Sequence, residues 1–411
     1  MGGLLSLGNL PEPAATPSVE LSEDLGEFAR AATIEEMVRL GREVLSDPTY
    51  PTARALARAG RGVVGCFPVY TPQEIAHAMG LVPVALHGGG ENLEINHADA
   101  ALGSFLCSIS KSTLELGLTG GLEAFRAVVF PYICDVSRNL EGIFPRLVPG
   151  RETFMLHLPQ NFHTPAALPF LVHEYSRLAE RFRAAGGSPL TEEALASSIE
   201  LFDLQRAGIR RLLSAKQGER PSLSLSESYV LRRLGGLVPR ELHVAMLERA
   251  ASELEHRARP ARDAIKVLLV GPFCEQPTLE LLDLLEQVGC EVVDDDLLQA
   301  HRWYPSVPPG GSALERLARA YVDSRMDIGV RATPTTKGEA ILSRLDATGA
   351  KGVVFLTAKF CEPALEDVVL YRQALDRRKV PYLHLEFEER STAYEQARLQ
   401  LETFVESIMF D

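Results

Sequence analysis

The chain has 411 residues, enough for two or three domains, and its composition, 46% hydrophobic and 24% charged, is that of an ordinary globular protein. Its 42 basic residues are outweighed by 55 acidic ones, and the net charge of -13 argues against a surface adapted to nucleic-acid phosphates. Six cysteines, irregularly spaced, are too few for a disulfide scaffold, so we expect reduced thiols in a cytoplasm.

The apolar patterning does not predict a membrane protein. The start of the chain has neither a basic segment nor a long apolar core, so we expect no secretory signal there. No apolar run reaches the length needed to span a bilayer. We therefore expect a protein that contacts neither membrane nor nucleic acid.

Residues 1–60 predict a loose tail followed by a helical lead-in, because apolar residues recur there at three- and four-residue spacing. Residues 61–160 predict a first α/β domain in which helices alternate with the apolar strands 62–67, 81–86 and 126–133. The first of these helices is expected to start with Thr71 as its N-cap.

Residues 161–260 predict a helical segment, with long helices over 165–185 and 191–216, the second capped by Thr191. The charged stretch 248–262 is expected to face solvent.

Residues 261–411 predict a second α/β domain, closed by a helix over 392–408. Its strands are expected at 264–272, 290–296, 352–358 and 381–386. The fold class is therefore α/β, with two open parallel-sheet domains of flavodoxin-like or Rossmann-like type joined by a helical segment.

Two of the predicted strands are each followed by a cysteine, Cys134 in the first α/β domain and Cys361 in the second. Ligands of parallel sheets lie beyond the carboxyl ends of the strands, so these cysteines could meet in a shared cleft. With Cys107 they are candidate ligands for zinc or an iron-sulfur cluster, since thiolates are soft donors. No C-x-x-C spacing is present, and the pattern alone favours buried, apolar thiols.

Other candidates have less support. Cys290 is expected in the core, and Cys66 is expected to be structural unless it lines the cleft. His97, which follows the glycine loop 88–90, is a weak candidate for substrate-facing proton transfer, the alternative being a solvated histidine in a flexible turn. The acidic run 294–296 could bind a hard cation, but a solvated turn is favoured.

Several segments together resemble the benzoyl-CoA reductase and 2-hydroxyacyl-CoA dehydratase family, and the resemblance covers most of the chain. The segments are Tyr70–Ile75, Gly80–Val84, Phe105–Ile109, Phe130–Asp135, Gly289–Asp296, Cys361–Pro363, Pro381–Glu386 and the closing helix. Each is weak alone, but the set is specific to the family.

The resemblance implies that Cys107, Cys134 and Cys361 hold a [4Fe-4S] cluster whose fourth iron is left to water, sulfide or substrate. It also implies an anaerobic enzyme subunit that pairs with a sister subunit, as a hetero-oligomer or a homodimer. A separate ATP-hydrolysing activator would supply the electron, in keeping with the lack of a G-x-x-x-x-G-K-[ST] phosphate loop here. The electron would pass to an acyl-CoA and give a ketyl radical anion.

That radical leads either to reduction of an aromatic ring or to loss of a hydroxyl-derived group. The glycine loop 88–90 and the context of Cys107 favour the aromatic-ring reductases of the benzoyl-CoA type. The alternatives are a 2-hydroxyacyl-CoA dehydratase subunit, a related double-cubane cluster reductase, an accessory or maturation protein of the same fold, and a two-domain binding protein with structural thiols. One departure is Asp203, which stands where asparagine is expected ahead of Arg206, and no catalytic acid can be carried over.

Overall fold

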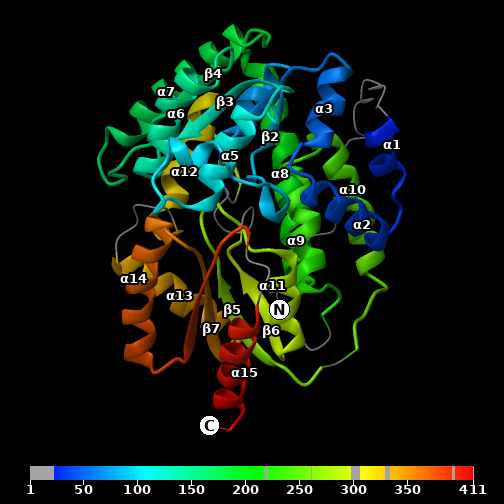
Figure 1. The fold of residues 1–411 in the computed structure, drawn as a ribbon, viewed down its shortest axis with the longest axis vertical. Helices are drawn as coiled ribbons and strands as arrows, with labels where there is room; N and C mark the ends of the chain where they lie inside the picture. Colours follow the sequence, from blue (N-terminus) through cyan, green and yellow to red (C-terminus); the bar gives the residue numbers. More distant parts are fainter. Residues whose placement is uncertain are drawn as a thin grey trace.

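Two parallel sheets, one above the other in Figure 1, form the centre of the protein. The computed structural model describes residues 23–217, 221–260, 262–297, 306–328, 334–390 and 394–410. The predicted tail lies outside them. Within the described residues every strand pairing is parallel, which confirms the predicted α/β class with two open parallel sheets.

The two sheets have the same topology. The strand order is β2-β1-β3-β4 in the first and β6-β5-β7-β8 in the second. The strands are β1 Val63–Cys66, β2 Val82–Ala85, β3 Phe125–Pro131, β4 Glu152–Leu156, β5 Ile265–Val270, β6 Cys290–Asp295, β7 Gly352–Ala358 and β8 Tyr382–Phe387. The central strands are buried on both faces over most of their length, which is why they appear in the sequence as largely apolar runs, interrupted by charged residues only near their starts, at Arg126 and Lys266.

Helices cover the sheets and form a layer along one side of both (Figure 1). They are α1 Glu23–Arg30, α2 Ile34–Ser46, α3 Pro51–Arg58, α4 Gln73–Ala78, α5 Ser108–Leu118, α6 Asp135–Leu147, α7 Ala167–Ala184, α8 Glu192–Ser214, α9 Leu225–Leu234, α10 Arg240–Leu254, α11 Leu279–Gln287, α12 Ala313–Ile328, α13 Pro334–Thr348, α14 Glu362–Arg378 and α15 Glu395–Met409, with single 3-10 turns at Gly90–Asn92 and Ala98–Ala100. The lead-in helices α1 and α2 pack on α10 and α9 of the helical segment. Helix α12, late in the sequence, packs on α7 and α8, and the predicted domain boundaries stay a prediction.

Two local predictions have different outcomes, and two elements were not predicted. Thr191 caps α8 as expected, accepting a hydrogen bond from the Ala194 amide. The prediction for Thr71 is wrong, because α4 begins at Gln73 and its N-cap, Pro72, makes no side-chain cap. Helix α6 and strand β4 were not expected, since β4 is an edge strand with mixed polar and apolar residues and α6 contains a proline.

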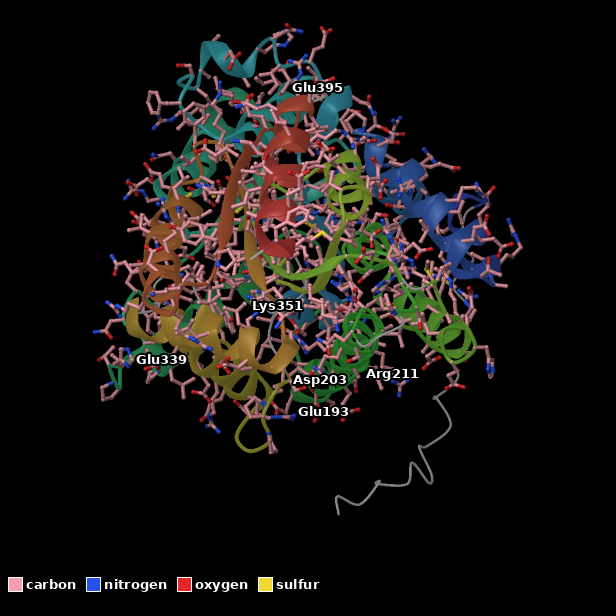
Figure 2. All side chains as sticks on the ribbon, turned by 90° about the horizontal axis from the view of Figure 1, so that it is seen from below. Glu193, Asp203, Arg211, Glu339, Lys351 and Glu395 are labelled. Carbon is pink, nitrogen blue, oxygen red and sulfur yellow. The ribbon has the colours of Figure 1, made fainter. Side chains whose placement is uncertain are left out.

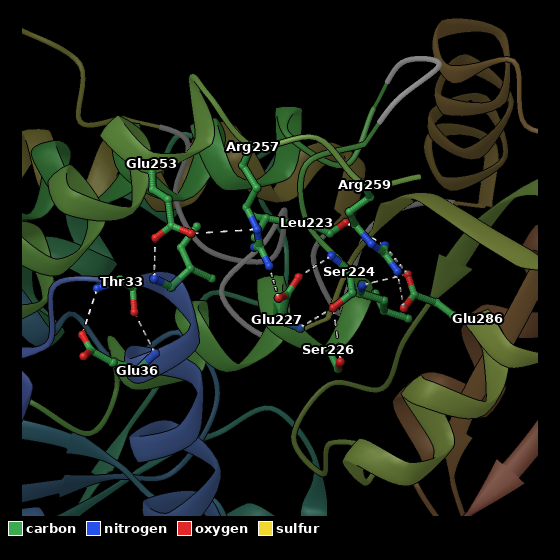
Figure 3. Close-up of polar contacts among 12 residues, drawn as sticks. Thr33, Glu36, Leu223, Ser224, Ser226, Glu227, Glu253, Arg257, Arg259 and Glu286 are labelled. Carbon is green, nitrogen blue, oxygen red and sulfur yellow. Dashed lines mark hydrogen bonds and ion pairs between the residues drawn. The ribbon is translucent and has the colours of Figure 1, made fainter. Parts of the chain in front are cut away.

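The charged stretch 248–262 only partly faces solvent: Glu248, Glu255 and Arg262 are exposed as predicted, but the prediction is wrong for the half-buried Glu253 and Arg259. Figure 3 shows Glu253 accepting a hydrogen bond from the Ile34 amide at 2.7 Å, which fastens α2 to α10. In the same view Arg259 reaches Glu286 on α11 at 3.0 Å. These half-buried contacts connect the helical layer both to the lead-in and to the second sheet.

The acidic run at the end of β6 is buried, which corrects the expectation of a solvated turn. Asp295 forms a two-pronged ion pair with Arg232 of α9, with N–O distances of 2.9 and 3.1 Å, and also pairs with Lys216. Asp294 pairs with Arg344 at 2.8 Å. Asp294 and Asp295 are thus each neutralised by a basic side chain from a neighbouring helix. The acidic run therefore has a structural role inside the protein.

Burial alone would raise the pKa of the Asp295 carboxyl, but Arg232 and Lys216 beside it hold that pKa well below its usual range. Arg232 and Asp295 are both fully buried, so removing either charge leaves the other without a partner in a medium of low polarity.

Among the described residues no helix is both long and apolar enough to cross a membrane.

We predict that Asp295→Asn lowers the free energy of unfolding by about 3–5 kcal/mol, because it leaves Arg232 and Lys216 buried without their counter-charge. Urea denaturation followed by circular dichroism measures this. The control is Asp346→Asn, which breaks an exposed pair with Arg378 and should change stability little. Equal effects of the two changes would contradict a special role for the buried network.

The difference in stability between wild type and Asp295→Asn should also depend on pH. The folded-state pKa of Asp295 lies below its unfolded value of about 3.9, so its stabilising contribution is complete above that pH and is lost as the pH falls toward the folded pKa. The stability gap between wild type and Asp295→Asn should therefore narrow below about pH 4.

Candidate functional site

A small cavity lies where the central strands of the two sheets end. It is lined by Phe67, Cys107, Ile109, Ser110, Ile133, Cys134, Val136, Phe273, Cys274, Glu275, Phe360, Cys361, Glu362 and Pro363. The lining comes largely from the segments after β1 and β3 of one sheet and after β5 and β7 of the other. In each sheet the strand order reverses direction between these two strands, and this is where open α/β sheets bind ligands. We call this space the cysteine cavity.

The three cysteines singled out from the sequence share one local geometry. Cys107, Cys134 and Cys361 are the N-cap residues of α5, α6 and α14. The Ser137 amide donates to Sγ of Cys134 at 3.4 Å, and Sγ of Cys107 lies 3.1 Å from the Ser110 hydroxyl. Helix N-termini carry partial positive charge, so each sulfur stands where negative charge is stabilised.

Burial opposes this stabilisation while the thiols are free of metal. It raises the pKa of Cys107 and of Cys134, and raises the pKa of Cys361 to about 12 despite the nearby Ala364 amide. The free thiols are therefore protonated at neutral pH. A metal that binds them must displace these protons and supply the positive charge that burial demands.

The other cysteines differ in position. Cys290 is buried at the start of β6, away from the cysteine cavity, as expected of core packing. Cys66 ends β1 in a buried position and does not line the cavity. Cys274 does line it, and its thiol donates to the Pro68 carbonyl at 3.0 Å. From the sequence alone Cys274 is a candidate with less support than the three proposed ligands, because it stands four residues beyond β5 in a loop.

A larger cavity of about 350 Å³ lies beside the first. It is lined by Arg42, Glu43, Leu45, Ser46, His87, Gly90, Asn92, Tyr229, Arg233, Gln276, Pro277, Thr278, Leu279, Glu280 and Glu389. The residues come from α2, the glycine loop, α9, the start of α11 and the segment after β8. We call it the arginine cavity, after Arg233, the more deeply buried of its two arginines.

Two buried carboxyl groups stand between the cavities. Glu275 lines the cysteine cavity and accepts hydrogen bonds from the amides of Ile109 at 3.1 Å and Glu389 at 3.0 Å. Burial and the neighbouring charge of Glu389 raise the pKa of Glu275 well above its usual range. Burial raises the pKa of Glu389 to about 7, against the opposing effect of Ser112 nearby. Nothing in the sequence pairs these two acids, which are 114 residues apart.

His97, the weak catalytic candidate, lines neither cavity. Its Nδ1 atom lies 2.7 Å from the buried Glu115 carboxylate, and its side chain is 67% exposed. Glu115 also accepts the backbone amides of His97 and Ala98, so it fixes the start of the 3-10 turn. A proton-transfer role for His97 stays a prediction.

A comparison with known protein families shows which family the chain belongs to. The family model described as 2-hydroxyglutaryl-CoA dehydratase, D-component, matches residues 68–408. The chain belongs to this family. The relationship predicted from the sequence segments is confirmed, and with it the expectation that the chain is an enzyme subunit.

Relatives of this D-component family are similar over most of their lengths. A benzoyl-CoA reductase subunit of Thauera aromatica is 32% identical over 355 residues, 86% of this chain and 92% of the relative. The beta subunit of lactoyl-CoA dehydratase from Anaerotignum propionicum is 28% identical, covering 91% and 99%. The beta subunit of (R)-2-hydroxyglutaryl-CoA dehydratase from Acidaminococcus fermentans is 24% identical, covering 93% and 100%.

The donor set of the cysteine cavity in this D-component family member fits an iron-sulfur cluster. It offers three thiols, each at a helix N-terminus, within walls formed largely by apolar side chains such as Phe67, Ile133 and Phe273. Among the described residues no three His, Cys, Asp or Glu side chains are arranged to hold a single metal ion. In a cluster each thiolate binds a different iron, so its ligands need not meet at one point.

Asp203, the departure from the family pattern, has a structural environment of its own. It lies on α8, labelled in Figure 2, and accepts a hydrogen bond from Arg206 at 2.8 Å. Arg206 is buried and also pairs with Glu74, so a negative charge at position 203 helps to balance a buried guanidinium. Asp203 lines neither cavity.

The glycine loop next to the arginine cavity gives a stability test. Gly88 has a φ of 76°, and a Cβ atom there would overlap the Glu389 carboxylate and the Ser112 hydroxyl. Gly90 has a φ of 59° but open space around it. We predict that Gly88→Ala lowers the free energy of unfolding by about 1 kcal/mol or more beyond the loss from Gly90→Ala, since both strain the backbone and only one clashes. Thermal denaturation of both variants tests this, and equal losses would contradict it.

Proposed function

We propose that the chain is the iron-sulfur, electron-accepting subunit of an ATP-dependent, activator-driven radical enzyme acting on a CoA thioester. The observation that carries the proposal is the convergence of Cys107, Cys134 and Cys361 from three helix N-termini on one cavity. These residues would hold a [4Fe-4S] cluster. The protein would work in the cytoplasm under anaerobic conditions, and its six cysteines, which are all free thiols, support this.

A bound cluster would supply single electrons at low potential. The chain's own groups prepare the site for it. The N-termini of α5, α6 and α14 stabilise the negative charge of thiolate ligands, and apolar walls limit the access of water. Glu275, held by two backbone amides, keeps a carboxyl group beside the cavity, and its raised pKa favours the protonated, uncharged form. An uncharged Glu275 adds no negative charge next to the cluster.

The electron would come from a separate ATP-hydrolysing activator, and a sister subunit of the same family would complete the enzyme, as a hetero-oligomer or a homodimer. The relatives named above are subunits of multisubunit enzymes, which supports a sister subunit. We favour reduction of an aromatic ring of the benzoyl-CoA type, because the benzoyl-CoA reductase relative has the higher identity, 32% against 28%. Dehydration of a 2-hydroxyacyl-CoA is the second candidate, favoured by the coverage of 99% for lactoyl-CoA dehydratase.

We predict that Cys134→Ala abolishes the broad visible absorption of the anaerobically purified chain and brings its iron and acid-labile sulfide near zero, because one of three ligands is lost. The matched control is Cys290→Ala, a buried thiol outside the cavity, which should keep the wild-type iron content. Unchanged iron in Cys134→Ala would contradict the cluster assignment. Near-zero iron in the wild type would favour structural thiols.

The reaction type has its own test. Co-purified with its sister subunit and supplied with the activator, ATP and a reductant, the enzyme should reduce benzoyl-CoA and should not dehydrate 2-hydroxyacyl-CoA thioesters. Product analysis by chromatography and mass spectrometry distinguishes the two. Turnover of only a 2-hydroxyacyl-CoA would reassign the enzyme as a dehydratase, while leaving the cluster assignment intact.

A further inference from the structure

The sulfur atoms of the three proposed cluster ligands differ in the groups beside them. The Ser137 amide of α6 donates to Sγ of Cys134 at 3.4 Å. Burial raises the pKa of Cys361, and the nearby Ala364 amide of α14 opposes that rise. Cys107 differs from both, because the described first turn of α5 gives its side chain no amide hydrogen bond. One of the three sulfurs therefore depends on another kind of donor.

A buried carboxyl group accounts for this difference at Cys107. An N-cap side chain normally accepts a hydrogen bond from the second or third amide of its helix. In α5 the second amide, that of Ile109, donates to the Glu275 carboxyl group at 3.1 Å instead. The third amide, that of Ser110, donates to the Cys107 carbonyl oxygen at 3.1 Å. Both amides are thus engaged away from the sulfur.

The hydroxyl group of Ser110 takes the place of an amide donor. Its Oγ atom lies 3.1 Å from Sγ of Cys107, and the serine is only 1% exposed. In the free thiol either group can donate the hydrogen. A thiolate bound to iron has no proton to give, so in the loaded site the hydroxyl group must be the donor. Ser110 also lines the cysteine cavity, which places this hydroxyl group at the site itself.

A hydrogen bond to a ligand sulfur affects the reduction potential of a cluster. Uptake of one electron makes the cluster more negative by one unit, and part of this charge resides on the cysteine sulfurs. A donor directed at such a sulfur stabilises the reduced form more than the oxidised form, which raises the potential. The largely apolar walls of the cysteine cavity strengthen this interaction, because they lower the local polarity.

We propose that Ser110 raises the reduction potential of the cluster in this subunit by donating its hydroxyl hydrogen to Sγ of Cys107. The inference rests on the proposed function, which supplies the cluster. In the step concerned one electron passes from the activator to the cluster, the proton stays on the Ser110 oxygen, and no covalent bond changes. Ser110 acts through Cys107 and is a positioning residue. It sets how readily the subunit accepts an electron.

The test is a redox titration of the full, anaerobically purified chain with a one-electron reductant, titanium(III) citrate. Electron paramagnetic resonance of the reduced cluster gives the midpoint potential. Ser110→Ala should keep the wild-type iron content and have a more negative midpoint potential, because the reduced form loses a hydrogen bond. Ser110→Thr, which keeps the hydroxyl group, should bring the potential back toward the wild-type value.

The matched control is Ser198→Ala. Ser198 is a buried serine of α8, outside the cysteine cavity, and its hydroxyl group donates to the Glu74 carbonyl oxygen at 2.9 Å. Its loss removes a buried hydrogen bond of the same kind, and the midpoint potential should stay at the wild-type value. An equal shift in Ser198→Ala and Ser110→Ala would assign the effect to altered packing and overturn the proposal.

Other outcomes also overturn it. Equal midpoint potentials for wild type and Ser110→Ala, with equal iron, would show that the hydroxyl group does not act on the cluster. Loss of iron from a folded Ser110→Ala would give the hydroxyl group a role in holding the cluster instead. Near-zero iron in the wild type would overturn the proposed function as well, whereas full iron with equal potentials overturns only the role of Ser110.

A second measurement needs no variant and decides the matter should Ser110→Ala fail to fold, which circular dichroism would show. After a brief exchange of the wild type into D2O, electron-nuclear double resonance of the reduced cluster should detect a deuteron close to it, because a hydroxyl hydrogen exchanges with solvent. A spectrum without such a deuteron would contradict a hydrogen bond from Ser110 to Cys107.

Discussion

The geometry of parallel strands is the constraint on which the site depends. In a parallel sheet every strand ends at the same edge, and the helix that follows begins there with its positive end toward that edge. Both sheets of this protein have the same strand order, so each offers one reversal point with such helix starts. The two edges meet at the cysteine cavity, and Cys134 and Cys361 are the first residues beyond β3 and β7 to cap a helix.

Buried charges hold the two sheets at this meeting point. Asp295 at the end of β6 is fastened to α9 through Arg232, and it also pairs with Lys216, just beyond α8. Glu275 in the second half binds the Ile109 amide in the first turn of α5. Such contacts are expensive to desolvate and add little net stability, but they are directional, and a displaced sheet would leave charges buried without partners. We infer that they fix the relative position of the halves more than they stabilise either half.

The sequence allowed the sheets and three of the four cysteines that line the cysteine cavity to be anticipated, because buried strands are largely apolar runs and Cys134 and Cys361 follow such runs, while Cys274 stands in a loop without a recognisable pattern. It did not predict β4, an edge strand with mixed residues, or the burial of Asp295, whose partners lie 63 and 79 residues away. Nor did it predict that the Glu389 carboxylate lies against Gly88 of the glycine loop, 301 residues earlier in the chain. Contacts between distant segments leave no local pattern, and the arginine cavity consists mainly of them.

One short segment of chain borders both cavities. Residues 274 and 275 line the cysteine cavity, and residues 276–280 line the arginine cavity. If occupants of both cavities bind one position of this segment more tightly, each raises the affinity of the other by the same factor, since linkage is reciprocal. A substitution that moves this segment is therefore expected to alter both cavities, whichever side it lies on.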